Sequence, residues 1–101
     1  MVDTAKVKLV TIIVAWELVD RLTFALGALG VTGYTTGRVA GRGIHGVRKR
    51  NVFDAGNVRL ETLVPPATAE KILEHVTKEY ADSEIVAFVH DVEAVPRSRF
   101  A

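Results

Sequence analysis

The chain has 101 residues, of which 49% are hydrophobic and 25% are charged, a composition typical of a globular protein and not of a disordered one. Its formal net charge is +1, so no overall positive field attracts nucleic acid, and such binding would need a local basic patch. The absence of cysteine excludes disulfides, zinc–cysteine sites and thiol catalysis, and the length predicts a single domain over residues 1–101.

The first predicted element is a strand over about residues 6–15. Apolar side chains alternate onto both of its faces: Val7, Leu9 and Ile13 on one, Val10, Ile12 and Val14 on the other. A strand with two apolar faces is covered on both sides. The apolar run 9–16 is too short to span a membrane, and Glu17 and Asp20 follow it where a leader peptide would have small residues. These features predict a cytoplasmic protein without a targeting segment or membrane insertion.

A helix is predicted over residues 17–29, which contain an apolar stripe at helical spacing: Leu18, Leu22, Ala25, Leu26 and Leu29. Trp16, between the first strand and this helix, is expected to be a packing aromatic of the core or of an interface. Residues 33–40 are rich in threonine and predict a second strand. Residues 58–64 alternate between apolar and wetter positions and predict a third.

Consecutive prolines at 65–66 end the third strand and can open a helix, which is predicted over residues 68–80 from its apolar stripe. The last strand is predicted over residues 84–95, and its first half is again apolar on both faces. A further proline ends this strand and begins a short C-terminal tail, residues 96–101.

The resulting order, βαββαβ, is that of the ferredoxin-like split-βαβ sandwich, an α+β fold with both helices on one face of a four-stranded sheet. The first and last strands are nevertheless apolar on both faces, and the two helices can cover only one of them. A monomer would leave the second face exposed to water. We therefore expect several copies of the chain to pack these faces together around a symmetry axis.

The connection between the second and third strands, residues 41–57, begins with the pattern GxGxxG at Gly41, Gly43 and Gly46. This spacing is typical of dinucleotide-binding folds, in which a strand precedes the glycines and a helix follows them. Here no apolar helical stripe follows the glycines, and the chain is too short for two βαβ halves. A Rossmann site is therefore rejected.

Two functional interpretations of this connection remain open. In the first, backbone amides and basic side chains form an anion-binding site. Basic side chains at the base of the connection would meet those of the tail, Arg97 and Arg99, if the tail lies nearby. In the second, the chain is a nucleic-acid-binding module that uses the basic residues 42–50, with an affinity that falls steeply as salt rises. Phe53 is the only aromatic residue of the connection, so base stacking would be poor and nucleic acid is the less favoured partner.

Along essentially its whole length the chain resembles the PII signalling family, through the βαββαβ order and the segment "GVTGYTTGRVAGRG" at 30–43. It is more similar still to the PII-like branch associated with bicarbonate transport and carboxysomes. That similarity rests on "VTGYT" at 31–35, "GRGIHGVR" at 41–48 and "RSRF" at 97–100. The resemblance implies a homotrimer that binds adenine nucleotides in clefts between subunits.

The resemblance also implies which residues bind the nucleotide. The start of the second strand would line the adenine and ribose pocket through Thr32, Gly33, Tyr34 and Thr35. The base of the following loop would hold phosphates through Gly41, Arg42, Gly43, His45 and Arg48. Bicarbonate, a second ligand of the carboxysome-associated members, would suit Gly41, Arg42 and Gly43. The basic residues of the tail, Arg97 and Arg99, would close over the nucleotide.

Residues 41–57 correspond to the T-loop of the family, which changes conformation with ligand and selects a protein partner. For this chain the implied partner is a transporter or a carboxysome component, with a location in the cytoplasm and in association with carboxysomes. The loop has no Tyr, Ser or Thr to modify, and residues 80–84 lack the Gly-Lys pair that grips polyphosphate. Both departures favour ADP or AMP, with ATP and cyclic AMP as further candidates, over ATP with 2-oxoglutarate.

The remaining polar residues predict no catalytic chemistry. The three histidines, His45, His75 and His90, do not have the spacing of metal ligands. No nucleophile, general base and oxyanion site can be assembled from the sequence. We therefore expect a protein that is not an enzyme and has no metal or cofactor.

Overall fold

The computed structural model describes residues 1–41 and 56–100. The elements are β1 (Ala5–Ala15), η1 (Trp16–Leu18), α1 (Val19–Ala28), β2 (Thr35–Val39), β3 (Asn57–Val64), α2 (Pro66–Glu79), β4 (Val86–Ala94) and η2 (Arg97–Arg99), where η denotes a short 3-10 helix. The βαββαβ order predicted from the sequence is therefore confirmed.

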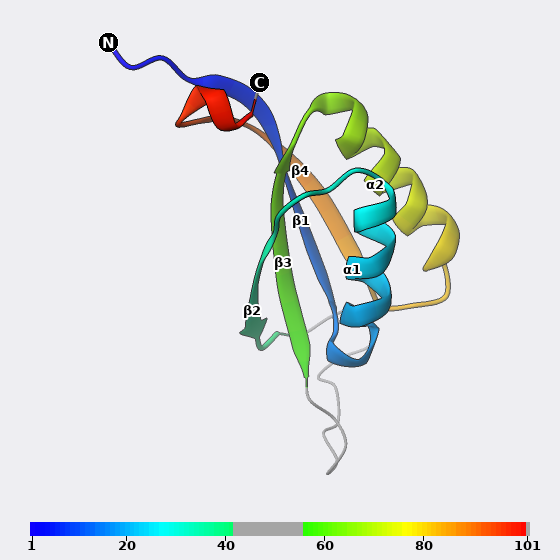
Figure 1. Ribbon diagram of the computed structural model, residues 1–101. Coiled ribbons are helices and arrows are strands. Elements are labelled where there is room, and N and C mark those ends of the chain that lie inside the picture. Colours follow the sequence, from blue (N-terminus) through cyan, green and yellow to red (C-terminus); the bar gives the residue numbers. More distant parts are fainter. Residues whose placement is uncertain (42–55, 101) are drawn as a thin grey trace.

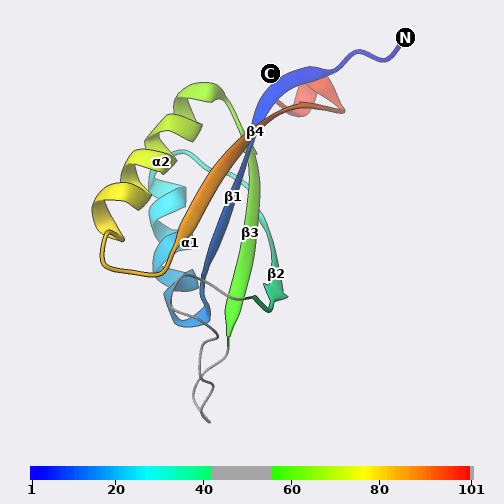
Figure 2. The same cartoon turned by 180° about the vertical axis from the view of Figure 1, so that it is seen from behind.

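The strands form one sheet in the order β2-β3-β1-β4, and every neighbouring pair is antiparallel. Both helices lie against the same face of this sheet (Figures 1 and 2). This is the α+β, ferredoxin-like arrangement predicted from the sequence. The two termini lie together at one end of the sheet, and β2 ends and β3 begins at the other end (Figure 1).

The core lies between the sheet and the two helices. Alternate residues of the central strand, Val10, Ile12 and Val14, point to the helices and are at most 1% exposed. They pack with Leu60 of β3 and with the apolar stripes of the helices, which include Leu22, Leu26, Ile72 and Val76. Burial of these stripes is what holds helices of this length in place, since isolated short helices are marginal in water.

The opposite face of the sheet, here called the open face, is not covered by either helix. Because Ala87 and Val89 pack against the core, their neighbours Phe88 and His90 point the other way, and their rings lie 5.6 Å apart edge to face. The cross-strand register completes the open face with Leu9, Thr11, Ile13, Arg59, Glu61, Leu63 and Val86. Leu63 and Val86 are 38% and 57% exposed, so a single chain leaves apolar surface on this face in water.

Several predicted boundaries are wrong by a few residues. The second strand begins at Thr35 and not at residue 33, because pairing with β3 starts at Thr35↔Glu61. The second helix begins at Pro66, two residues before the predicted start, since proline fits the first helical turn and the Pro65 carbonyl accepts a hydrogen bond from the Ala69 N–H at 3.0 Å. Part of the predicted tail forms η2.

Candidate functional site

A cleft of about 870 Å³ lies at the end of the sheet that carries the termini. Its walls come from four parts of the chain: Gly30 and residues 32–35 before and at the start of β2, residues 61–65 at and just after the end of β3, residues 92–94 of β4, and the tail at Arg99 and Phe100. Val7 and Leu9 of β1 form its floor. Antiparallel pairing brings these segments together, because β3 ends where β1 and β2 begin.

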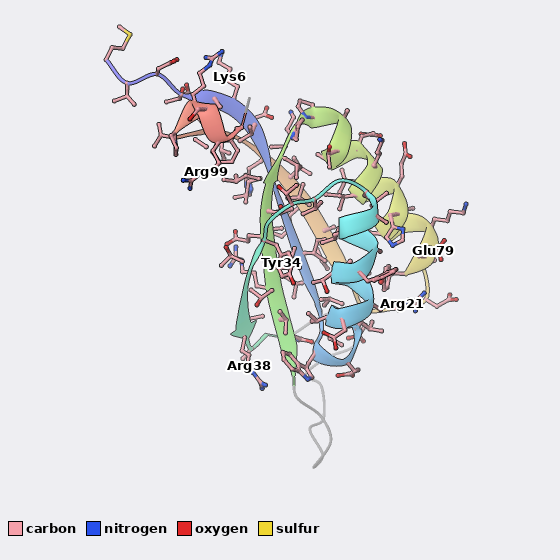
Figure 3. The ribbon with its side chains drawn as sticks, viewed as in Figure 1. Lys6, Arg21, Tyr34, Arg38, Glu79 and Arg99 are labelled. Carbon is pink, nitrogen blue, oxygen red and sulfur yellow. The ribbon has the colours of Figure 1, made fainter. Side chains whose placement is uncertain are left out.

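Five of the residues predicted to bind nucleotide line this cleft. They are Thr32, Gly33, Tyr34, Thr35 and Arg99. The first four follow one another in sequence, whereas Arg99 reaches the cleft from η2 at the other end of the chain (Figure 3). The structure thus joins two of the predicted segments in one site.

Two other predicted residues that the structure describes, Arg97 and Gly41, do not line the cleft. The guanidinium of Arg97 lies 3.3 Å from the Asp3 carboxylate and donates to the Thr4 carbonyl oxygen at 3.2 Å, so it points to the N-terminal segment. Gly41 follows β2 at the far end of that strand and does not line the cleft. The remaining predicted ligands, Arg42, Gly43, His45 and Arg48, lie outside the described residues, as does the whole of the basic segment 42–50.

Two carboxylates of the cleft, Glu61 and Glu93, were missed by the sequence analysis. The Glu61 carboxylate accepts a hydrogen bond from Thr11 at 3.4 Å and lies 3.8 Å from the Arg59 guanidinium. The Glu93 carboxylate accepts a hydrogen bond from the Thr4 hydroxyl at 2.6 Å. The alternation of residues 58–64 already predicted that Glu61 lies on the wetter face of the third strand. Aligning this strand antiparallel to the second would have placed Glu61 near the predicted nucleotide-binding residues, because the structure pairs it with Thr35.

The described lining of the cleft combines an exposed aromatic ring, apolar surface, hydrogen-bonding groups and one cation with the two carboxylates. Tyr34 is 51% exposed and presents a ring, while Leu9 and Leu63 provide apolar surface. Threonine hydroxyls and backbone groups offer hydrogen bonds. Arg99 is the only basic residue among the described residues that line the cleft, and it can form charge-assisted hydrogen bonds to an anion.

One hydrogen bond holds the wall of the cleft to the sheet. Thr62 is 3% exposed, and its hydroxyl donates to the Gly33 carbonyl oxygen at 2.6 Å. This contact fixes residues 32–34, which precede β2 and have no strand partner of their own. A buried hydroxyl that anchors a segment in this way contributes about 0.5–1.5 kcal/mol to stability.

The substitution Thr62→Val is expected to lower the free energy of unfolding by about 1 kcal/mol, because it preserves the shape of the side chain and leaves the Gly33 carbonyl without its donor. The measurement is equilibrium unfolding in urea. Thr77→Val is the matched control, since the Thr77 hydroxyl is exposed and donates to the Leu73 carbonyl within α2. Equal stability losses in the two variants would contradict the anchoring role of Thr62.

Within residues 1–41 and 56–100, no three acidic or histidine side chains lie close enough together to hold a metal ion. No helix of the described chain is long and apolar enough to cross a membrane.

The chain is similar to known proteins in both sequence and structure. A family model described as nitrogen regulatory protein P-II matches residues 7–100, and no curated protein sequence matches the chain. A PII-like signalling protein from Thermus thermophilus has a similar structure, with 31% sequence identity, a TM-score of 0.82 and coverage of 98% of this chain and 99% of that chain.

Two structures of CPII from Thiomonas intermedia are also similar. The first, bound to ADP and bicarbonate, is 25% identical with a TM-score of 0.87 over 100% of both chains. The second, bound to ADP, AMP and bicarbonate, is 25% identical with a TM-score of 0.80, and the match covers 91% of this chain and 96% of that chain.

Proposed function

The chain belongs to the nitrogen regulatory protein P-II family, and from this premise we propose that it is a non-enzymatic, PII-like regulatory sensor that binds an adenine nucleotide. The observation that carries the proposal is the cleft in which residues 32–35 meet Arg99. In this proposal its aromatic ring packs on the base, its hydroxyls form hydrogen bonds with the ribose, and its guanidinium binds a phosphate. The structure of CPII that matches this chain over its full length has ADP bound.

ADP and AMP are the preferred ligands of this proposal, and ATP and cyclic AMP are further candidates. The 41–57 connection has no Tyr, Ser or Thr that could be modified, a departure from the nitrogen-regulating members, which respond to ATP with 2-oxoglutarate. The turn between α2 and β4 also lacks a Gly-Lys pair that could hold a longer polyphosphate. Both features argue against a requirement for ATP.

Bicarbonate is the second proposed ligand, at the base of the 41–57 connection. Gly41, Arg42 and Gly43 would bind it through backbone amides and a guanidinium, which are suitable donors for a small planar anion. The CPII structures contain bicarbonate together with ADP. The proposal extends this pairing to the present chain, where inorganic carbon would be the signal that is sensed with the nucleotide.

In the proposed assembly three copies pack their open faces together, and each cleft lies between two subunits. The apolar surface of the open face supports self-association, because a monomer would leave it in water. Ligand binding would then change the conformation of the 41–57 connection and with it the affinity for a protein partner, a transporter or a carboxysome component. A location in the cytoplasm, in association with carboxysomes, belongs to the same proposal.

Titration calorimetry with ADP, AMP, ATP and cyclic AMP, each with and without bicarbonate, tests the proposed function. We expect ADP or AMP to bind with a micromolar dissociation constant and bicarbonate to change that constant, because two sites of one protein are thermodynamically coupled when their ligands favour the same conformation of the 41–57 connection. If no nucleotide binds below millimolar concentration, the sensor function is excluded. An unchanged nucleotide affinity with bicarbonate would exclude the second ligand alone.

The alternative function, nucleic-acid binding through residues 42–50, is tested by a gel-retardation assay with DNA and RNA at two salt concentrations. Binding that falls steeply with salt, without any heat from nucleotide, would favour this alternative. The basic segment 42–50 lies outside the part of the chain that the structure describes, so this alternative is decided by the assay.

A further inference from the structure

Trp16, the one tryptophan of the chain, contacts the end of β2 and the residue that precedes β3. Its backbone N–H donates a hydrogen bond to the Gly56 carbonyl oxygen at 2.9 Å, directly before β3 begins. The guanidinium carbon of Arg38, the penultimate residue of β2, lies 4.7 Å from the centroid of the Trp16 ring. A single residue after β1 therefore holds both the end of β2 and the start of β3.

The register of the sheet explains how Arg38 reaches this ring. Arg38 is paired with Val58 on β3, and Val58 is paired with Val14 on β1. Directly opposed residues point to the same face, so Arg38 lies on the helix-covered side, where Val14 and Val58 are each 1% exposed. Its guanidinium reaches past the start of β3 and stacks on Trp16, which keeps 46% of its surface exposed.

The strand that carries Arg38 has few other constraints. β2 is a five-residue edge strand that pairs with β3 alone, and four of its residues are exposed and one is half-buried. Its first residue, Thr35, lines the nucleotide cleft next to Tyr34, and Arg38 lies toward the opposite end of the strand (Figure 3). With a rise of about 3.3 Å per residue, the strand spans roughly 10 Å between Thr35 and Arg38. A shift at one end of so short a strand moves the other end.

We propose that Arg38 is a positioning residue for the nucleotide cleft. Its stacking on Trp16 holds β2 in the position that places Thr35 in the cleft wall, and occupation of the cleft in turn strengthens the stack. The coupling must act in both directions, because linked equilibria are reciprocal. The inference rests on the proposed nucleotide function for its ligand, and it assigns a role to two residues that do not touch that ligand.

The fluorescence of Trp16 tests the inference directly, because no other tryptophan contributes to the signal. ADP is expected to shift the emission of the wild-type protein in a saturable way, with the dissociation constant that calorimetry reports. Arg38→Gln should abolish this shift, make Trp16 more accessible to acrylamide and weaken ADP binding about two- to fivefold, the range that a partly exposed cation–π contact predicts.

Two further variants separate the stack from charge and from general stability. Arg38→Lys keeps the positive charge and removes the planar guanidinium, so it should lose most of the emission shift. Arg21→Gln is the matched control, because Arg21 makes the same type of contact elsewhere, with its guanidinium carbon 5.1 Å from the centroid of the Tyr80 ring. This control should keep both the wild-type emission shift and the wild-type affinity for ADP.

The outcomes distinguish the inference from the function on which it rests. If calorimetry shows ADP binding while Trp16 emission stays constant, or if Arg38→Gln binds ADP as tightly as the wild type, the positioning role is overturned and the nucleotide function stands. If wild-type protein gives neither heat nor an emission change with any adenine nucleotide, the proposed function is overturned, and the positioning role with it.

Discussion

Replacing Arg99 with alanine is expected to weaken ADP binding by about 10- to 100-fold, the loss typical of a charge-assisted hydrogen bond of roughly 1.5–3 kcal/mol. Arg99 is the basic side chain that the described residues contribute to the cleft wall, while the Glu61 and Glu93 carboxylates there already accept hydrogen bonds from threonines. Titration calorimetry with ADP measures the effect. A comparison with AMP shows how much of it depends on the second phosphate.

Arg97→Ala is the matched control for this prediction. Arg97 is two residues away in the same tail, has the same chemistry, and is engaged with Asp3 and the Thr4 carbonyl. Its side chain is 61% exposed in this ion pair, and exposed pairs contribute little to stability, so the variant should fold normally and change ADP affinity less than about twofold. Equal losses in both variants would show that the tail binds nucleotide through both arginines.

A carboxylate placed on the open face should dissociate the proposed trimer. In Phe88→Asp the new charge replaces a half-buried ring of β4 that lies next to His90, and an unpaired carboxylate buried between subunits costs several kcal/mol. Light scattering after gel filtration should give three times the 11.0 kDa chain mass for the wild type and the single chain mass for the variant at micromolar concentration. Calorimetry should show loss of ADP binding as well, since each proposed cleft lies between two subunits.

Phe24→Asp provides the control, because Phe24 belongs to α1 on the other side of the sheet and is 83% exposed. The same substitution at this position should leave the mass and the ADP affinity unchanged. If Phe88→Asp also keeps the trimer mass, the open face is not the interface between subunits, and another surface must hold the copies together.

The fold could be predicted from the sequence because each helix and strand has its own periodic pattern of apolar residues. The apolar stripe with Leu22 and Leu26 has helical spacing, and the alternation through Val58 and Leu60 has strand spacing, so element types and their order follow from burial alone. Boundaries were predicted less well, since the start of β2 depends on pairing with Glu61 and not on local composition. The expectation that Trp16 is a packing aromatic described only part of its role, because its partner Arg38 lies on another strand.

The candidate site also has a part that the sequence predicted and a part that only the tertiary structure revealed. Residues 32–35 form a continuous motif, and the resemblance to a known family was enough to select them. Two arginines in one tail, by contrast, are chemically equivalent in sequence, and only the tertiary structure directs Arg97 to the N-terminal segment and Arg99 to the cleft. Glu61 and Glu93 likewise join the site through strand register.

The sequence by itself determined the βαββαβ order and the faces that become buried, because hydrophobic periodicity acts over a few residues at a time. Its motifs at 31–35, 41–48 and 97–100 indicated the family through resemblance. The tertiary structure decided which distant side chains share one cleft and which residue ties β2 to β3. Those contacts depend on the register between strands, and a shift of one residue in a strand would move every one of its side chains to the other face.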